Sequence, residues 1–145
     1  MVALRKEDAE LESTLAAHRI KTEIQNILGD NYKVSARSEK FGLNTSNIFV
    51  MVADVSPLYG ITDNSPVHMK FMMHLTDGFG RAVDMNKVSF EQITAHYMQR
   101  RNNIKFRKVS STKSIDDCAT KLIEWFNKVK PQLDALLTEE IRSAL

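Results

Sequence analysis

The chain has 145 residues, of which 43% are hydrophobic and 26% are charged, and its formal net charge is +2. These values are typical of one globular domain and argue against wholesale disorder. The longest apolar run, Ile48–Ala53, is far shorter than the roughly 20 residues that span a bilayer. The N-terminus turns acidic where a secretory signal would be apolar. We therefore expect a single cytoplasmic domain over residues 1–145.

The first predicted element is a helix from Lys6 to Leu28. Acidic side chains gather near its start, where the helix dipole favours them. Gly29 follows the last apolar residue, which is a usual place for a C-terminal cap. The apolar residues recur at helical spacing, and Leu11 and Leu15 would widen their stripe. The stripe consists of Ala9, Ala16, Ala17, Ile20, Ile24, Ile27 and Leu28.

Strand patterns fill the middle of the chain. Apolar and polar residues alternate over Tyr32–Arg37, which predicts a half-buried strand. Ile48–Ala53 is apolar on both faces, as in a central strand that is covered on both sides. Val67–Leu75 has the clearest period-two pattern. Asp77–Gly80 supplies turn residues, after which Arg81–Met85 would return as the second strand of a hairpin.

A short helix is predicted next, and a last strand after it. Ser89 can cap the helix, with Gln92 three residues further on as in a capping box. Arg100 and Arg101 would then lie at the negative end of the helix dipole. Ile104–Val109 is predicted to be the last strand. The apolar face of the short helix would carry Phe90, Ile93, Thr94, Tyr97 and Met98.

The strongest helical pattern is at the C-terminus. Ser114 is the predicted cap, and Asp116 and Asp117 lie in the first turn. Pro131 interrupts the run, but the apolar stripe keeps its phase, which indicates one long kinked helix or two helices that share a buried face. The stripe consists of Ile115, Cys118, Leu122, Phe126, Val129, Leu133, Leu136, Leu137, Ile141 and Ala144.

This order of elements predicts an α+β fold. We expect a mainly antiparallel sheet of about five strands, flanked by an N-terminal helix, a short helix and a long C-terminal helix kinked near Pro131. The apolar residues after Pro131 exceed what a small sheet readily covers. A homodimer or a hetero-complex through this part of the last helix is therefore expected.

Patterns for metal binding and nucleophilic catalysis are not found. His68 and His74 would face the same side of a strand about 20 Å apart, too far to share an ion. His18 and His96, both assigned to helices, have no carboxylate or second histidine at ligand spacing. Cys118 falls on an apolar helix face, where a cysteine behaves as a small hydrophobe. No cofactor and no metal are expected.

The most distinctive segment of the chain is basic. Residues 99–113, QRRNNIKFRKVSSTK, hold six positive charges and no acidic residue, and the remainder of the chain has a net charge of −4. Fixed cations among amides and hydroxyls are typical of phosphate binding. Tyr97 and Phe106 could support bases, although both fit the core better. The predicted polyanion-binding residues are Arg100, Arg101, Lys105, Arg107, Lys108 and Lys113.

Three hypotheses about function follow. The first is a non-enzymatic protein that binds a polyanion, with nucleic acid preferred, through the basic segment. The second is an inhibitor, adaptor or assembly subunit that grips an acidic protein with the same segment or associates through the C-terminal helix. The third is an enzyme with an unrecognised site, for which Asp54 and Asp84 offer a carboxylate pair that any α+β protein could supply.

Overall fold

The computed structural model describes residues 2–40, 47–58, 65–76, 87–90, 92–99, 101–111 and 114–144. Within these ranges the chain forms two long helices and seven strands. No helix in the described part of the chain combines the length and apolarity that a membrane crossing requires. In chain order the elements are β1 (Val2–Arg5), α1 (Lys6–Leu28), β2 (Tyr32–Lys40), β3 (Asn47–Pro57), β4 (Met69–Thr76), β5 (Lys87–Phe90), β6 (Gln92–Gln99), β7 (Val109–Ser111) and α2 (Ile115–Ala144).

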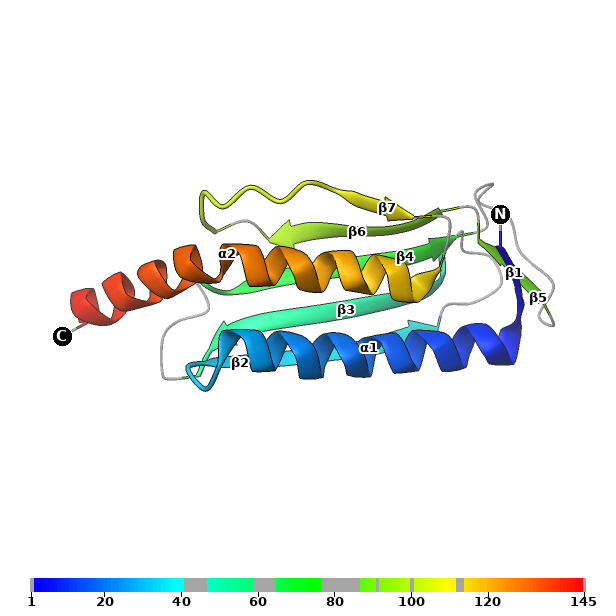
Figure 1. The fold of residues 1–145 in the computed structure, drawn as a ribbon, viewed down its shortest axis with the longest axis horizontal. Helices are drawn as coiled ribbons and strands as arrows, with labels where there is room; N and C mark the ends of the chain where they lie inside the picture. The colour runs from blue at the N-terminus through cyan, green and yellow to red at the C-terminus, as the bar shows by residue number, and fades with distance from the viewer. Residues whose placement is uncertain are drawn as a thin grey trace.

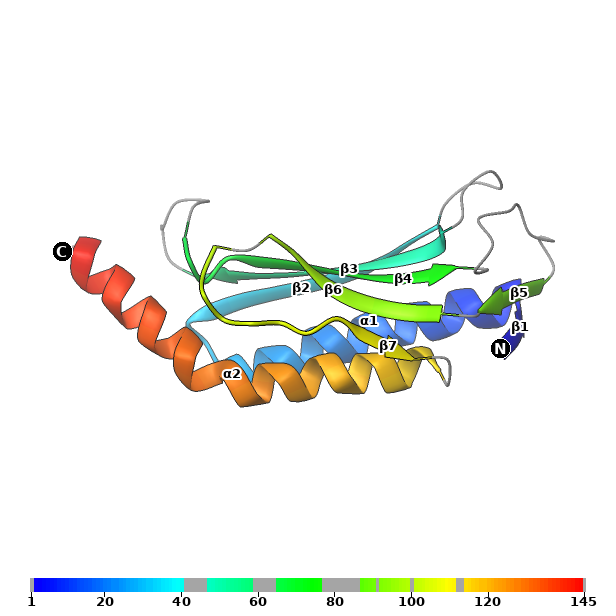
Figure 2. The same ribbon diagram turned by 90° about the horizontal axis from the view of Figure 1, so that it is seen from above.

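The main sheet has five antiparallel strands in the order β2-β3-β4-β6-β7. Strands β1 and β5 form a separate two-stranded sheet. Figures 1 and 2 show that α1 and α2 lie side by side on one face of the main sheet. The protein is therefore an α+β fold with an N-terminal helix, a five-stranded antiparallel sheet and a long C-terminal helix, as predicted.

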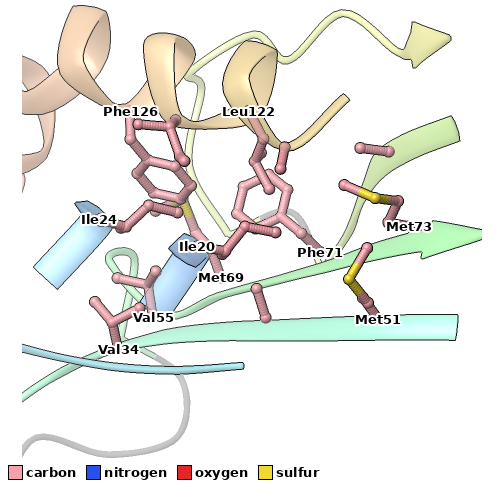
Figure 3. Packing of buried hydrophobic residues seen from close by; sticks show 14 of the residues in the cluster. Ile20, Ile24, Val34, Met51, Val55, Met69, Phe71, Met73, Leu122 and Phe126 are labelled. Atoms are coloured by element: carbon pink, nitrogen blue, oxygen red, sulfur yellow. The ribbon is translucent and has the colours of Figure 1, made fainter. Parts of the chain in front are cut away.

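The core lies between the helices and the inward face of the sheet. Figure 3 shows Ile20 and Ile24 of α1 and Leu122 and Phe126 of α2 pointing toward the strands. Phe71 of β4 is the centre of an aromatic cluster. Its ring centroid lies 5.0 Å from that of Tyr97, 5.2 Å from those of Phe106 and Phe126, and 5.5 Å from that of Trp125.

Helix α1 has the predicted bounds, and Gly29 ends it with a positive φ of 86°. Glycine adopts this conformation at little cost, which is why it suits the cap. The amide of Gln25 holds the turn that follows: it donates to the carbonyls of Gly29 and Tyr32 at 2.9 and 2.8 Å and accepts from the Val34 N–H at 3.0 Å. The amphipathic pattern does not reveal this clamp.

The predicted widening of the α1 stripe is wrong. Leu11 and Leu15 are each 57% exposed, because their side of the helix faces away from the sheet. Arg19 instead links the two helices. Its guanidinium donates to Asp116 Oδ1 and Thr120 Oγ1, both at 2.7 Å, and also to Glu23 of its own helix.

Helix α2 is one continuous helix with Pro131 inside it. The Ser114 hydroxyl accepts from the Asp117 N–H at 2.9 Å, which confirms the predicted cap. Proline cannot donate the usual backbone hydrogen bond and crowds the preceding turn, and Figure 2 shows the helix axis changing direction between its orange and red parts. The Tyr32 hydroxyl, which donates to Asp134 Oδ1 at 3.0 Å, joins the helix after Pro131 to β2.

Most apolar residues after Pro131 are already covered within the monomer. Leu133 and Leu137 are buried, and Leu136 packs against the core. Ile141, by contrast, is 45% exposed. The predicted association through this part of α2 was based on a large exposed apolar surface. The described residues after Pro131 expose less apolar surface than that prediction assumed.

The predicted short helix is wrong, because residues 92–99 form strand β6. Ile93 and Tyr97 are four residues apart and share a face in either conformation, so this pair did not distinguish the two. Ile93, Ala95 and Tyr97 face the core at a period of two, and Phe71 lies opposite Tyr97 in the ladder with β4. The ladder with β4 gives this segment backbone hydrogen bonds that local capping signals do not anticipate.

The predicted last strand is also misplaced. The strand is β7, Val109–Ser111, and residues 101–108 have no regular secondary structure. Ile104 is buried and Phe106 packs against the core, so the predicted inward residues are right even though the strand is not.

The hairpin prediction is only partly covered by the structure. Its turn and its return strand, residues 77–85, lie outside the described residues. In the main sheet, β4 pairs with β3 and with β6. Strand β1 at the start of the chain was not predicted, because four residues are too few to show a period.

Candidate polyanion-binding site

Four of the six predicted cations lie in the described part of the chain, and Arg101 follows strand β6 where the end of a helix was expected. Arg100 and Lys113 lie outside the described residues. Arg101, Lys105, Arg107 and Lys108 lie along the segment 101–108, which contacts α2 through the hydrogen bond from the Trp125 indole to the Lys105 carbonyl. Eight residues of extended chain cover roughly 20 Å. The structure therefore spreads the described cations along a line, with Arg101 near one end and Lys108 at the other.

A hollow of about 420 Å³ lies where this segment passes the first half of α2. Two predicted cations, Arg107 and Lys108, face it together with Lys121 and Lys128 from the helix. Glu124 is the only carboxylate among the described residues that line it. The Lys121 ammonium is 3.5 Å from a carboxylate oxygen of Asp117, which offsets part of its charge. We call this hollow the basic groove. Its lining is Arg107, Lys108, Val109, Ser110, Lys121, Glu124, Trp125 and Lys128.

The sequence spacing of the two helix cations indicates that they share a face. Lys121 and Lys128 are seven residues apart, which is close to two helical turns, so they lie on one face of α2. Charge counting within one window of sequence omits such residues. Here the tertiary structure brings two cations of the segment beside two cations and one carboxylate of the helix, which gives the described lining a net charge of +3.

Trp125, the only tryptophan of the chain, holds the segment against α2. Its indole N–H donates to the Lys105 carbonyl at 3.2 Å. Its ring meets those of Phe106 and Phe126 edge to face, at centroid distances of 5.0 Å in both cases. Since Trp125 also lines the basic groove, its fluorescence would report on a ligand bound there.

A second hollow, of about 670 Å³, lies further along the same segment and helix. The Asn102 side chain shapes it by donating to the Pro66 carbonyl at 2.7 Å and accepting from the Ile104 N–H at 3.0 Å. We call this hollow the amide pocket. Its lining is Pro66, Arg101, Asn102, Asn103, Ile104, Gln132, Ala135, Leu136 and Glu139.

The two hollows lie one after the other along α2. The helix residues that line them, from Lys121 through Trp125, Lys128 and Gln132 to Glu139, recur every three, four or seven positions and therefore share one face of α2. At 1.5 Å per residue this face is about 27 Å long. Among the described lining residues, the basic groove is positive, whereas the amide pocket has one cation, one carboxylate and three amides.

Tyr97 and Phe106, which could have supported bases, face the core. Tyr97 stacks on Phe71, and Phe106 packs edge to face against the same ring. Both pack against the core, as their sequence pattern favours. Trp125 is the aromatic residue beside the cations, and no motif in the sequence indicated that.

The histidines have an arrangement that the sequence did not predict. His96 lies on β6, not on a helix, and its ring stacks on that of His74 at a centroid distance of 4.9 Å. Burial, followed by the charges of His96 and Lys108, lowers the pKa of His74. Among the described residues, no three His, Cys, Asp or Glu side chains are arranged to hold a metal ion.

Cys118 and Asp54, which the sequence offered as candidates for chemistry, are not among the residues that line either hollow. Cys118 is fully buried, and burial raises the pKa of its thiol to about 12, which keeps it protonated at neutral pH. Asp54 on β3 lies 3.8 Å from His68 and 3.9 Å from Lys70. Asp84, its proposed partner in a carboxylate pair, is outside the described residues.

Comparisons of the chain with protein-family models, with curated proteins and with solved structures returned no match.

Proposed function

We propose that this protein binds a polyanion, and nucleic acid in particular, with the basic groove as its phosphate-contacting surface. The observation that carries the proposal is the meeting of Arg107 and Lys108 with Lys121 and Lys128 around one hollow. Cations that two elements fix around a concave surface focus their field on it. A row of phosphates gains more from such a surface than from the same charges scattered over the molecule.

The other predicted residues are neighbours of the groove residues in the sequence. Arg101 and Lys105 continue along the segment, and Arg100 and Lys113 flank its described part in the sequence. As part of the same proposal, the protein is a non-enzymatic binding protein that works in the cytoplasm without a cofactor. The groove would also attract an acidic protein, and the experiment below separates that alternative.

The test measures binding of a labelled single strand of about 12 nucleotides, a length within the usual site size, by anisotropy and by Trp125 fluorescence. The variant Arg107→Ala/Lys108→Ala/Lys121→Ala/Lys128→Ala should bind every sequence more weakly. The slope of log affinity against log salt should fall by roughly 0.7 for each lost phosphate contact. The fold should survive, because the charged ends of these four side chains face the hollow.

The matched control is Lys21→Ala/Lys33→Ala, which removes two exposed cations from α1 and β2. Its affinity and salt slope should stay close to those of the wild type. A wild-type protein that binds no nucleic acid at low salt contradicts the proposal. If that protein bound poly-glutamate and the quadruple variant did not, the groove would be assigned to an acidic protein partner.

A further inference from the structure

The amide pocket has the size of a small-molecule site, and its described lining combines an apolar wall with polar groups. Its volume of about 670 Å³ lies within the range of small-molecule sites. Ile104, which is buried, and Leu136, which packs on the core, give it an apolar wall. Asn103, Gln132 and Glu139 place exposed polar groups around that wall.

The pocket wall is held in place before any ligand arrives. Both ends of the Asn102 amide are committed to backbone groups, at Pro66 and Ile104. The hydroxyl of Ser65 donates to a carboxylate oxygen of Glu140 at 2.6 Å. Ser65 precedes the lining residue Pro66 in the chain, and Glu140 follows the lining residue Glu139. A preorganised wall reduces the entropy that a ligand must overcome.

We propose that the amide pocket receives a base of a single-stranded nucleic acid whose phosphates contact the basic groove. This inference rests on the proposed function and names its ligand class. The two hollows share one face of α2 over about 27 Å, which is long enough for several nucleotides. Single strands can turn bases out to be read at their edges, whereas a duplex keeps those edges paired.

The polar groups of the pocket indicate which bases fit. The amides of Asn103 and Gln132 can each donate and accept hydrogen bonds, so they suit any base edge. The carboxylate of Glu139 only accepts, and exocyclic amino groups are its natural donors. Cytosine has such an amino group at the position where thymine has a carbonyl. The Arg101 guanidinium only donates, and the O2 carbonyl that it could contact is common to cytosine and thymine. We therefore expect Glu139 to make cytosine preferred over thymine.

The experiment compares three probes of equal length and charge: oligo-dC, oligo-dT and an abasic deoxyribose-phosphate chain. Wild-type protein should bind oligo-dC about 10-fold more tightly than the abasic chain, with oligo-dT between them. Asn103→Ala/Gln132→Ala should remove most of this difference and leave abasic binding unchanged. Glu139→Gln should reduce the preference for oligo-dC over oligo-dT. Asn26→Ala, an exposed amide on α1, is the matched control and should change neither ratio.

The outcomes separate this inference from the proposed function. Equal affinity for all three probes overturns the base pocket and leaves polyanion binding in place. A loss of abasic binding in the amide variants, at unchanged melting temperature, also overturns it, because the amides would then act on phosphates. Failure of every probe to bind overturns the proposed function and the base pocket together.

Discussion

The two faces of the main sheet contrast sharply. The inward face carries Val34, Met51 and Phe71 under both helices, in one continuous apolar cluster. The outward face has no helix over it among the described residues, and its middle is built from Val50, Val52, Met72, His74 and His96.

Burial alone does not distinguish these faces. Val50 and Val52 are only 1% and 6% exposed, although neither belongs to the main core cluster. They lie opposite His74 and Met72 in the ladder with β4. Longer side chains on neighbouring strands can shield a small residue without a second layer of structure. An apolar central strand is therefore weak evidence for helices on both sides, and the expectation that β3 is covered on both sides does not follow from its composition.

The largest difference between the faces should appear at two consecutive residues. Phe71→Ala removes the centre of the aromatic cluster and should lower the free energy of unfolding by about 3–5 kcal/mol. Met72→Ala, on the other face of the same strand, should cost about 1 kcal/mol or less. Urea denaturation followed by Trp125 fluorescence measures both. Phe71→Leu is the fallback if the alanine variant does not fold. Equal costs at the two positions would show that the outward face is packed as tightly as the core.

The second prediction carries the comparison to α2 beyond Pro131. Leu133→Ala should destabilise the protein by about 2–5 kcal/mol, because Leu133 is fully buried. Ile141→Ala should change stability by no more than about 0.5 kcal/mol. Thermal melts at several protein concentrations measure both effects. A concentration-dependent loss of stability in the Ile141 variant would instead identify the end of α2 as a contact between copies of the chain.

The smallest effect is expected at His74, and it depends on pH. Because its pKa is lowered in the fold, the unfolded chain binds more protons than the native one below the ordinary histidine pKa of about 6.5. The stability from neutral His74 is therefore present above that pKa and is lost as the pH falls through it toward the folded value. NMR titration of the histidine ring protons measures the shift directly.

The matched variants for His74 are two lysine substitutions. Lys108→Met removes one of the charges that lower the pKa of His74, so its titration should move upward. Lys33→Met, at an exposed position of β2, should leave it in place. A His74 titration at the unperturbed value in the wild type would contradict the burial of His74 and its closeness to the charges of His96 and Lys108.

The sequence predicted those features that local periodicity and capping specify. The bounds of α1, the caps at Gly29 and Ser114, and the phase of the α2 stripe across Pro131 all follow from spacing within one element. For residues 92–99 the same local signals predicted a helix, whereas the segment forms strand β6. Ile93 and Tyr97 satisfy a helix and a strand equally, and pairing with β4 decided between them.

The candidate site divides in the same way. The sequence by itself predicted a basic segment, because six charges lie close together along the chain, at Arg100, Arg101, Lys105, Arg107, Lys108 and Lys113. Only the tertiary structure decided that Lys121 and Lys128 face Arg107 across a groove, that Trp125 lies beside them, and that Gln132 and Glu139 meet Asn103 in a pocket. Side-chain neighbours from distant parts of the chain are set by how α2 packs beside residues 101–110, and no local pattern encodes that packing.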